Sequence, residues 1–408
     1  MSLSPPSDIA SSQPAAATDG HRNRRLGPDT VICHAGRDPS AHFGVVNPPV
    51  FHASTILFPT LAALDAKAEA KVRYGRRGTP TTFALEDAVS ALEEAAGTVL
   101  TPSGANAIST TLLAHLDPGD HVLIADNVYG PCRHCGNDVL RRFGVEVEFY
   151  DPLVGSGIDR LIKPNTRLIW MEAPGSLTFE MTDITAIVAA ARPRGIVTVV
   201  DNTWSGGVFF KPLTLGVDIS VQAGTKYISG HSDLMLGTIS CSETSYERVK
   251  GFAQRLGICV GPDDAYLAQR GLRTISVRMR QHHANALELA NWLAKRPEVT
   301  RVMYPALQTD PGHELWKTHF TGASGLFGFV IRETDRQRLA AMVDGLRLFG
   351  MGSSWGGYES LLLPTDPRIL RSATTWREPG QCMRVHVGLE DVSDLIDDLE
   401  RGFERLGR

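Results

Sequence analysis

The 408-residue sequence contains only six cysteines, which are too few for a disulfide framework in a chain of this length. No apolar run approaches the ~20 residues needed to cross a bilayer, so a membrane-spanning helix is not expected. The net charge of −4 gives no electrostatic reason to expect nucleic acid as a partner. These absences predict a cytoplasmic protein with neither nucleic acid nor membrane among its partners.

The amino-terminal residues 1–25 predict a disordered tail, because they begin with a stretch rich in Ser, Pro and Ala that lacks the apolar core of a secretion signal. Cys132 and Cys135 form a single Cys-x-x-Cys, which is compatible with redox activity or half of a zinc site. Because no second pair has matching spacing, isolated buried thiols are favoured. No metal site is predicted.

The remaining sequence has the length and composition of a globular enzyme, with 42% apolar and 21% charged residues. Short apolar strands alternate with helical patterns, for example a helix over 86–96, a strand at 121–125, a helix over about 132–143 and a strand at 167–171. This alternation predicts an α/β fold with a mostly parallel central sheet. We expect an arm at 26–73, a larger domain at 74–271 and a smaller C-terminal domain at 272–408.

Asp201 and Lys226 are the most informative pair of residues. Asp201 ends the apolar run 195–200, and Lys226 follows a second short strand at 217–221, so both are expected at the carboxyl edge of the sheet, where such folds hold ligands. A desolvated lysine with an acidic partner suits Schiff-base chemistry with pyridoxal phosphate (PLP), whose ring nitrogen the carboxylate keeps protonated. Taken singly, such an Asp is commonly a helix cap and such a Lys a solvated surface residue.

A third anchor for a phosphorylated cofactor lies in the turn at residues 101–105. Ser103, Gly104 and Ala105 sit between a predicted strand and a predicted helix, where backbone N–H groups and the helix N-terminus favour a phosphate. Small residues at such a turn also occur without any ligand. The turn therefore supports a phosphorylated cofactor only in combination with Asp201 and Lys226.

Four segments taken together resemble the Cys/Met-metabolism family of PLP-dependent enzymes. They are YGRRGTPT at 74–81, DNTW at 201–204, TKYISGHSD at 225–233 and SWGGYES at 354–360. The resemblance runs in the same order from about Arg73 to the end of the chain. It implies the aspartate aminotransferase-like fold, fold type I, with PLP as cofactor.

The resemblance also implies roles for individual residues. Lys226 would hold PLP and act with Tyr129 in catalysis. The residues implied in cofactor binding are Tyr74 and Arg76 from a neighbouring subunit, and Ser103, Gly104, Ala105, Tyr129, Asp201, Thr225 and Lys226 from the same subunit. Those implied in substrate binding are Arg77, Ser354, Trp355 and Arg384. From the residues alone, Arg77 could equally form a subunit salt bridge and Arg384 could be a surface strand residue.

Within the family, the resemblance favours the branch of cystathionine β-lyases. Trp355 stands where many γ-synthases and γ-lyases have Leu, and residues 174–177 lack the Asn that those relatives carry. The implied activity is cleavage of L-cystathionine, or a related cysteine S-conjugate, by a homo-oligomer, expected to be a tetramer, with shared active sites and a role in methionine biosynthesis. A γ-synthase or γ-lyase and a non-catalytic PLP-fold binding protein are the alternatives.

Overall fold

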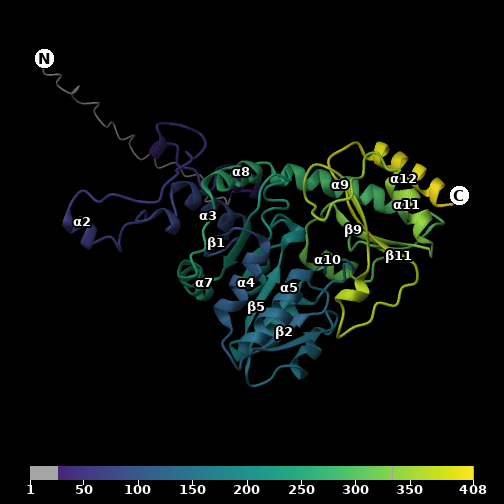
Figure 1. Ribbon diagram of the computed structural model, residues 1–408, viewed down its shortest axis with the longest axis horizontal. Coiled ribbons are helices and arrows are strands. Elements are labelled where there is room, and N and C mark those ends of the chain that lie inside the picture. The colour runs from purple at the N-terminus through teal and green to yellow at the C-terminus, as the bar shows by residue number, and fades with distance from the viewer. Residues whose placement is uncertain (1–25, 333, 408) are drawn as a thin grey trace, which may run out of the picture.

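Two β-sheets organise the chain in the computed structural model, which describes residues 26–332 and 334–407 (Figure 1). The tail predicted at 1–25 lies outside the described residues. The larger sheet has the strand order β1-β7-β6-β5-β4-β2-β3. Its strands are β1 Gly97–Thr101, β2 His121–Ala125, β3 Glu146–Tyr150, β4 Thr166–Glu172, β5 Val197–Asp201, β6 Ile219–Gln222 and β7 Gly237–Cys241.

The larger sheet is mostly parallel. Strand β2 pairs in parallel with β3 and β4, β4 with β5, and β5 with β6, whereas β7 runs antiparallel to β1 and β6. All residues of β1, β2, β6 and β7 are buried, as expected for strands of a sheet covered on both faces by helices. The predicted mostly parallel α/β sheet is therefore confirmed.

The smaller sheet lies toward the C-terminus and is antiparallel, with the order β10-β11-β9-β8. Its strands are β8 Val299–Met303, β9 Leu326–Ile331, β10 Leu361–Thr365 and β11 Gln381–His386. Helices α9, α11 and α12 lie beside it in Figure 1. The predicted smaller C-terminal α/β unit is thus present.

The helices alternate with the strands of the larger sheet and then cover the smaller one. They are α1 Pro28–His34, α2 Leu61–Asp65, α3 Pro80–Glu93, α4 Gly104–His115, α5 Gly130–His134, α6 Ile184–Ala191, α7 Glu243–Arg255, α8 Pro262–Leu272, α9 Ile275–Leu293, α10 His313–His319, α11 Arg336–Asp344 and α12 Val392–Leu406. No helix in the described ranges is long and apolar enough to cross a membrane.

Two helices differ from their sequence-based bounds. The helix expected at 86–96 begins at Pro80, because proline suits the first helical position and the Thr82 hydroxyl oxygen accepts a hydrogen bond from the Thr79 N–H. The helix expected at 132–143 is wound in three ways: α5 ends at His134, 135–140 forms a π-helix and 141–143 a 3₁₀ turn.

A buried carboxylate, Asp126, connects the larger sheet to the segment that precedes β11 of the smaller sheet. It follows β2 and accepts hydrogen bonds from the backbone N–H groups of Ser372 (2.9 Å), Ala373 (3.1 Å) and Thr374 (2.7 Å), and it also pairs with Arg133. Because three backbone donors and a guanidinium converge on one fully buried carboxylate, the segment 372–374 is fixed against the larger sheet. This contact places Leu370 at the edge of the cavity described next.

Candidate active site

The carboxyl ends of the parallel strands open into one cavity between the two sheets. Strand β4 ends at Glu172, β5 ends at Asp201, and Lys226 follows β6. The lining residues are Gly104, Ile108, Tyr129, Gly130, Pro131, Glu172, Pro174, Gly175, Ser176, Leu177, Phe179, Asp201, Thr203, Trp204, Ala223, Lys226, Leu326, Trp355, Leu370 and Arg384. The cavity therefore brings Lys226, Asp201, Tyr129, Trp355 and Arg384 together, although they are far apart in the sequence.

Lys226 sits in a turn between β6 and β7. Its Nζ donates a hydrogen bond to the Ser354 Oγ at 2.7 Å and lies 5.2 Å from the centre of the Trp355 ring. Burial and, to a smaller extent, the neighbouring Arg384 lower the pKa of Lys226 to about 8, and Asp201 opposes the shift. A much larger fraction of this amine is therefore neutral, and so nucleophilic, near physiological pH than for an ordinary lysine.

Asp201 is 8% exposed at the end of β5. Its Oδ1 accepts hydrogen bonds from the Thr203 N–H at 3.0 Å and the Thr203 hydroxyl at 2.5 Å, whereas its Oδ2 has no hydrogen-bond donor among the described residues. Burial raises the pKa of the Asp201 carboxyl, and the Thr203 hydrogen bonds oppose that shift. Because Asp201 lines the cavity, this carboxylate oxygen without a donor is suited to a cationic N–H of a ligand there.

The turn before α4 forms a small cradle beside the lysine. Ser103 caps the helix by accepting the Asn106 N–H at 3.1 Å, and a Cβ on Gly104 would lie 2.5 Å from the Ala223 Cβ. Thr225 is held by the Leu236 backbone, which it contacts at 2.9 and 3.2 Å. Open N–H groups at the N-terminus of a 12-residue helix, with hydroxyls beside it, are suited to a phosphate group.

Arg384 projects from β11 into the same cavity. Its Nη2 donates to the carbonyl oxygens of Gly352, Ser353 and Ser354 at 3.3, 3.0 and 3.2 Å. These bonds fix one arm of the guanidinium, and the rest of the planar fork can pair with a carboxylate. The same contacts hold the loop that carries Ser354 and Trp355, whose ring packs 5.5 Å from that of Tyr227.

Three predicted site residues lie away from this cavity. Tyr74, Arg76 and Arg77 precede α3, and the Arg76 guanidinium donates to the Gln254 carbonyl oxygen at 2.7 Å. Tyr74 and Arg76 line a separate hollow with Cys259 and residues of the arm. Within one chain, therefore, these three side chains do not meet Lys226.

Glu172 is a cavity residue that sequence reasoning did not find. Its Oε2 accepts a hydrogen bond from the Tyr129 N–H at 2.7 Å, and its backbone is opposite Asp201 in the β4–β5 pairing. The strand was expected at 167–171, one residue short of Glu172. The signal that could have found this residue is its position as the first polar side chain at the carboxyl edge of that strand.

The two cysteines of the Cys-x-x-Cys are free and buried, Cys132 within α5 and Cys135 at the start of the π-helix that follows it. Burial raises the pKa of the Cys135 thiol to about 11 and also raises that of Cys132. Such thiols are poor nucleophiles because the thiolate is the reactive form.

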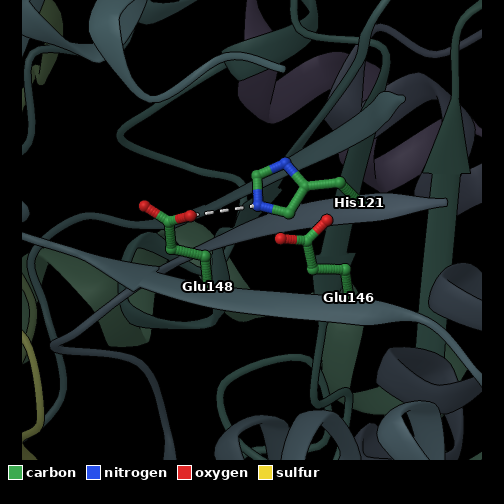
Figure 2. A group of neighbouring side chains, drawn as sticks. All are labelled: His121, Glu146 and Glu148. Carbon is green, nitrogen blue, oxygen red and sulfur yellow. Dashed lines mark ion pairs between the residues drawn. The ribbon is translucent and has the colours of Figure 1, made fainter. Parts of the chain in front are cut away.

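A second group of titratable side chains lies at the opposite, amino edge of the sheet (Figure 2). The side chains of His121, Glu146 and Glu148 place one ligand atom each within 4.8 Å of one another. Lys163 Nζ lies 2.7 Å from Glu146 Oε1 and 2.6 Å from Glu148 Oε2. The ammonium group already supplies positive charge between the two carboxylates, so the cluster is a salt-bridge network that does not require a metal ion.

Comparison with known proteins relates the chain to one enzyme family over most of its length. The Cys/Met metabolism PLP-dependent enzymes match residues 29–404. The cystathionine beta-lyase MetC of Escherichia coli K12 is 44% identical over 389 residues, 93% of this chain and 98% of the relative. The cystathionine beta-lyase of Salmonella typhimurium LT2 is 43% identical over the same shares of the two chains.

A solved structure gives the same result for the fold. The crystal structure of metB from Corynebacterium glutamicum superposes with a TM-score of 0.87 at 32% identity, covering 93% of this chain and 98% of the other. The predicted fold type I of PLP-dependent enzymes is confirmed, and the cavity has both an open carboxylate oxygen and a helix-terminal cradle that suit this cofactor. The chain belongs to the Cys/Met metabolism PLP-dependent enzyme family.

Proposed function

We propose that the protein is a carbon–sulfur β-lyase that cleaves L-cystathionine, or a related cysteine S-conjugate, to homocysteine or another thiol, pyruvate and ammonia. The observation that carries the proposal is the cavity itself, where the amine of Lys226 lies 5.2 Å from the centre of the Trp355 ring and shares the cavity with Arg384. The two bacterial relatives described above are named for this activity and match nearly the whole chain.

Several side chains are positioned to hold the cofactor. Lys226 would bind it covalently, Asp201 would pair with its ring nitrogen, and Ser103, Gly104, Ala105 and Thr225 would bind its phosphate. When bound, PLP supplies an electron sink for the charge that develops at the substrate Cα. Tyr129 lines the same cavity, where its ring would cover the cofactor.

The protein side chains then move the protons. Arg384 grips the substrate α-carboxylate and so orients the Cα–H bond toward the Lys226 amine, which takes that proton as general base. As the carbon–sulfur bond breaks, its electron pair leaves with the sulfur, which receives a proton from Lys226 or Tyr129. Burial raises the pKa of Tyr129, so its phenol stays protonated and able to donate.

The active site is proposed to be completed by a second copy of the chain. Residues 26–73 form an arm that carries exposed apolar side chains, among them Leu57 (88% exposed) and Leu61 (72% exposed), and α2 lies away from both sheets in Figure 1. Burial of this arm on a neighbouring subunit would bring Tyr74 and Arg76 to that subunit's phosphate site and Arg77 to its substrate. We propose a homotetramer of such dimers.

We propose the following domain organisation and location for the protein. Residues 74–271 would be the PLP-binding domain and 272–408 the C-terminal domain, and the enzyme would act in the cytoplasm in methionine biosynthesis.

Product analysis tests the reaction. The protein loaded with PLP and given L-cystathionine is expected to release pyruvate, ammonia and homocysteine in equal amounts. A γ-lyase would release 2-oxobutyrate in place of pyruvate, and a non-catalytic PLP-fold protein would release neither keto acid. Pyruvate from another cysteine S-conjugate, with none from cystathionine, would reject the substrate and keep the reaction.

Uptake of the cofactor is expected to depend on pH through Lys226. Because only the neutral amine attacks an aldehyde, the rate at which cofactor-free protein takes up PLP should rise about tenfold per pH unit below pH 8 and level off above it. The growth of visible absorbance at fixed PLP concentration measures this rate. A rate that keeps rising to pH 10.5, the ordinary pKa of lysine, would contradict the shift.

A further inference from the structure

Glu172 is the second carboxyl group of the cavity, and the roles proposed above leave it without a task. It ends β4, between β2 and β5 in the sheet, and is paired in register with Asp201. A carboxyl group is costly to bury beside another carboxyl group unless it makes a compensating contact. The contact that Glu172 makes is the 2.7 Å hydrogen bond from the Tyr129 N–H.

Tyr129 depends on its backbone for its position. Its phenol oxygen has no hydrogen-bond partner within the described ranges, and the residue is 43% exposed. The Tyr129 carbonyl oxygen accepts the N–H groups of Cys132 (2.9 Å) and Arg133 (3.3 Å) in the first turn of α5. Glu172 accepts the hydrogen bond of the Tyr129 N–H. Contacts to both the N–H and the carbonyl oxygen of Tyr129 therefore direct its ring over the cavity.

The turn that carries Tyr129 also contacts the end of β2, where the Val128 N–H donates to the Ala125 carbonyl oxygen at 3.3 Å, and a neighbouring loop. The Asn127 carbonyl oxygen accepts the Ser176 N–H at 2.7 Å, and a Cβ on Gly175 would lie 1.9 Å from the Asn127 side chain. Glu172 is the side chain that fastens this turn to β4, and through the β4–β5 pairing to the strand that presents Asp201.

We propose that Glu172 is a positioning residue, which holds the Tyr129 ring over the cofactor by accepting the hydrogen bond of the Tyr129 N–H. The proposal rests on the role given to Tyr129 in the proposed function. Burial and the neighbouring Asp201 both raise the pKa of the Glu172 carboxyl, and the Tyr129 N–H opposes them. A neutral amide should therefore replace this group well, because it keeps an oxygen that can accept the bond.

The test compares Glu172→Gln with Glu172→Ala, each alone and combined with Tyr129→Phe and Tyr129→Ala. We expect Glu172→Ala to weaken PLP binding and lower kcat about tenfold each, the usual effect of losing one hydrogen bond to a charged or strongly polar group, and Glu172→Gln to stay within about threefold of the wild type. Because Tyr129→Phe keeps the ring and the backbone N–H, the cost of Glu172→Ala for PLP binding should persist there. In the Tyr129→Ala background, which has no ring to position, Glu172→Ala should weaken PLP binding less than about twofold.

Glu146→Ala is the matched control, because Glu146 is a carboxylate of the same sheet that contacts Lys163 at the opposite edge. It should leave both readouts unchanged. Equal losses in the Gln and Ala variants of Glu172, or a full cost of Glu172→Ala in the Tyr129→Ala background, would overturn the proposal. PLP binding, followed by visible absorbance, is measured without turnover, so failure of the β-lyase assignment would leave this test intact.

Discussion

Replacement of Lys226 by alanine is expected to abolish keto-acid formation and to remove the visible absorbance of the bound cofactor. Two functions would be lost together, because the same amine is proposed to bind PLP covalently and to carry the proton at Cα. General base catalysis alone contributes about 10²- to 10⁴-fold, so the loss in kcat should reach at least about 10³-fold. Pyruvate assay and an absorbance spectrum of the purified variant measure the two effects separately.

A control separates this result from a general effect of lysine removal. Lys163→Ala removes a lysine at the opposite sheet edge, where the Nζ contacts Glu146 and Glu148, and should keep the spectrum and the activity. Lys211 offers a second comparison, since its Nζ is also partly buried but is held by the carbonyl oxygens of Leu92 and Gly207, away from the cavity. A visible band that persists in Lys226→Ala would show that the cofactor is bound through another amine.

The sequence predicts those parts of the site that local patterns mark. An apolar strand that ends in Asp201, a short strand before Lys226 and a small-residue turn at 101–105 each have a local signature. Parallel pairing of β5 with β6 brings the first two to one edge, and β1 points the same way as β6 because both run antiparallel to β7. Arg384 has no such signature, because a single arginine in an antiparallel strand resembles any surface residue. Its role came from the family resemblance, and the structure places it in the cavity beside Lys226.

Contacts between segments that are far apart in the chain cannot be predicted from local sequence patterns. Asp126 binds the backbone of residues 372–374, about 250 positions later in the chain, and nothing near Asp126 in sequence indicates that partner. Glu172 faces Asp201 through strand register, which a sequence does not state. The arm shows the same limit, since the surface proposed to bury its exposed apolar side chains belongs to a second copy of the chain.

The charges around Lys226 explain why its pKa falls although a carboxylate is near. Asp201 favours the ammonium form, but burial and the positive charge of Arg384 disfavour it more strongly. In the proposed function Asp201 would pair with the cofactor, while Arg384 would bind the substrate carboxylate and also lower the pKa of Lys226. A substitution of Arg384 should therefore change both substrate binding and the pKa of Lys226.

Replacement of Arg384 by alanine is expected to lower kcat/KM about 10²- to 10³-fold, because a desolvated charge pair with the substrate carboxylate contributes about 2–5 kcal/mol. Arg384→Lys should recover only part of this loss, since an ammonium lacks the planar fork and cannot hold the carbonyl oxygens of Gly352, Ser353 and Ser354 in the same way. Binding of the substrate carboxylate by Arg384 can be separated from its other contacts by comparing steady-state kinetics with cystathionine and with a thioether amine that lacks the carboxylate. The amine should bind the wild type and Arg384→Ala with similar affinity.

Arg384→Ala should also move the pH dependence of PLP uptake to higher pH. Without the neighbouring cation the ammonium form of Lys226 is less disfavoured, so its pKa should rise from about 8 toward the ordinary value of 10.5. Arg368→Ala, which removes an exposed arginine paired with Asp366, should leave both the kinetics and the uptake profile unchanged. If Arg384→Ala lowered kcat/KM without moving the uptake profile, the arginine would act on the substrate alone, and burial would account for the lowered pKa of Lys226.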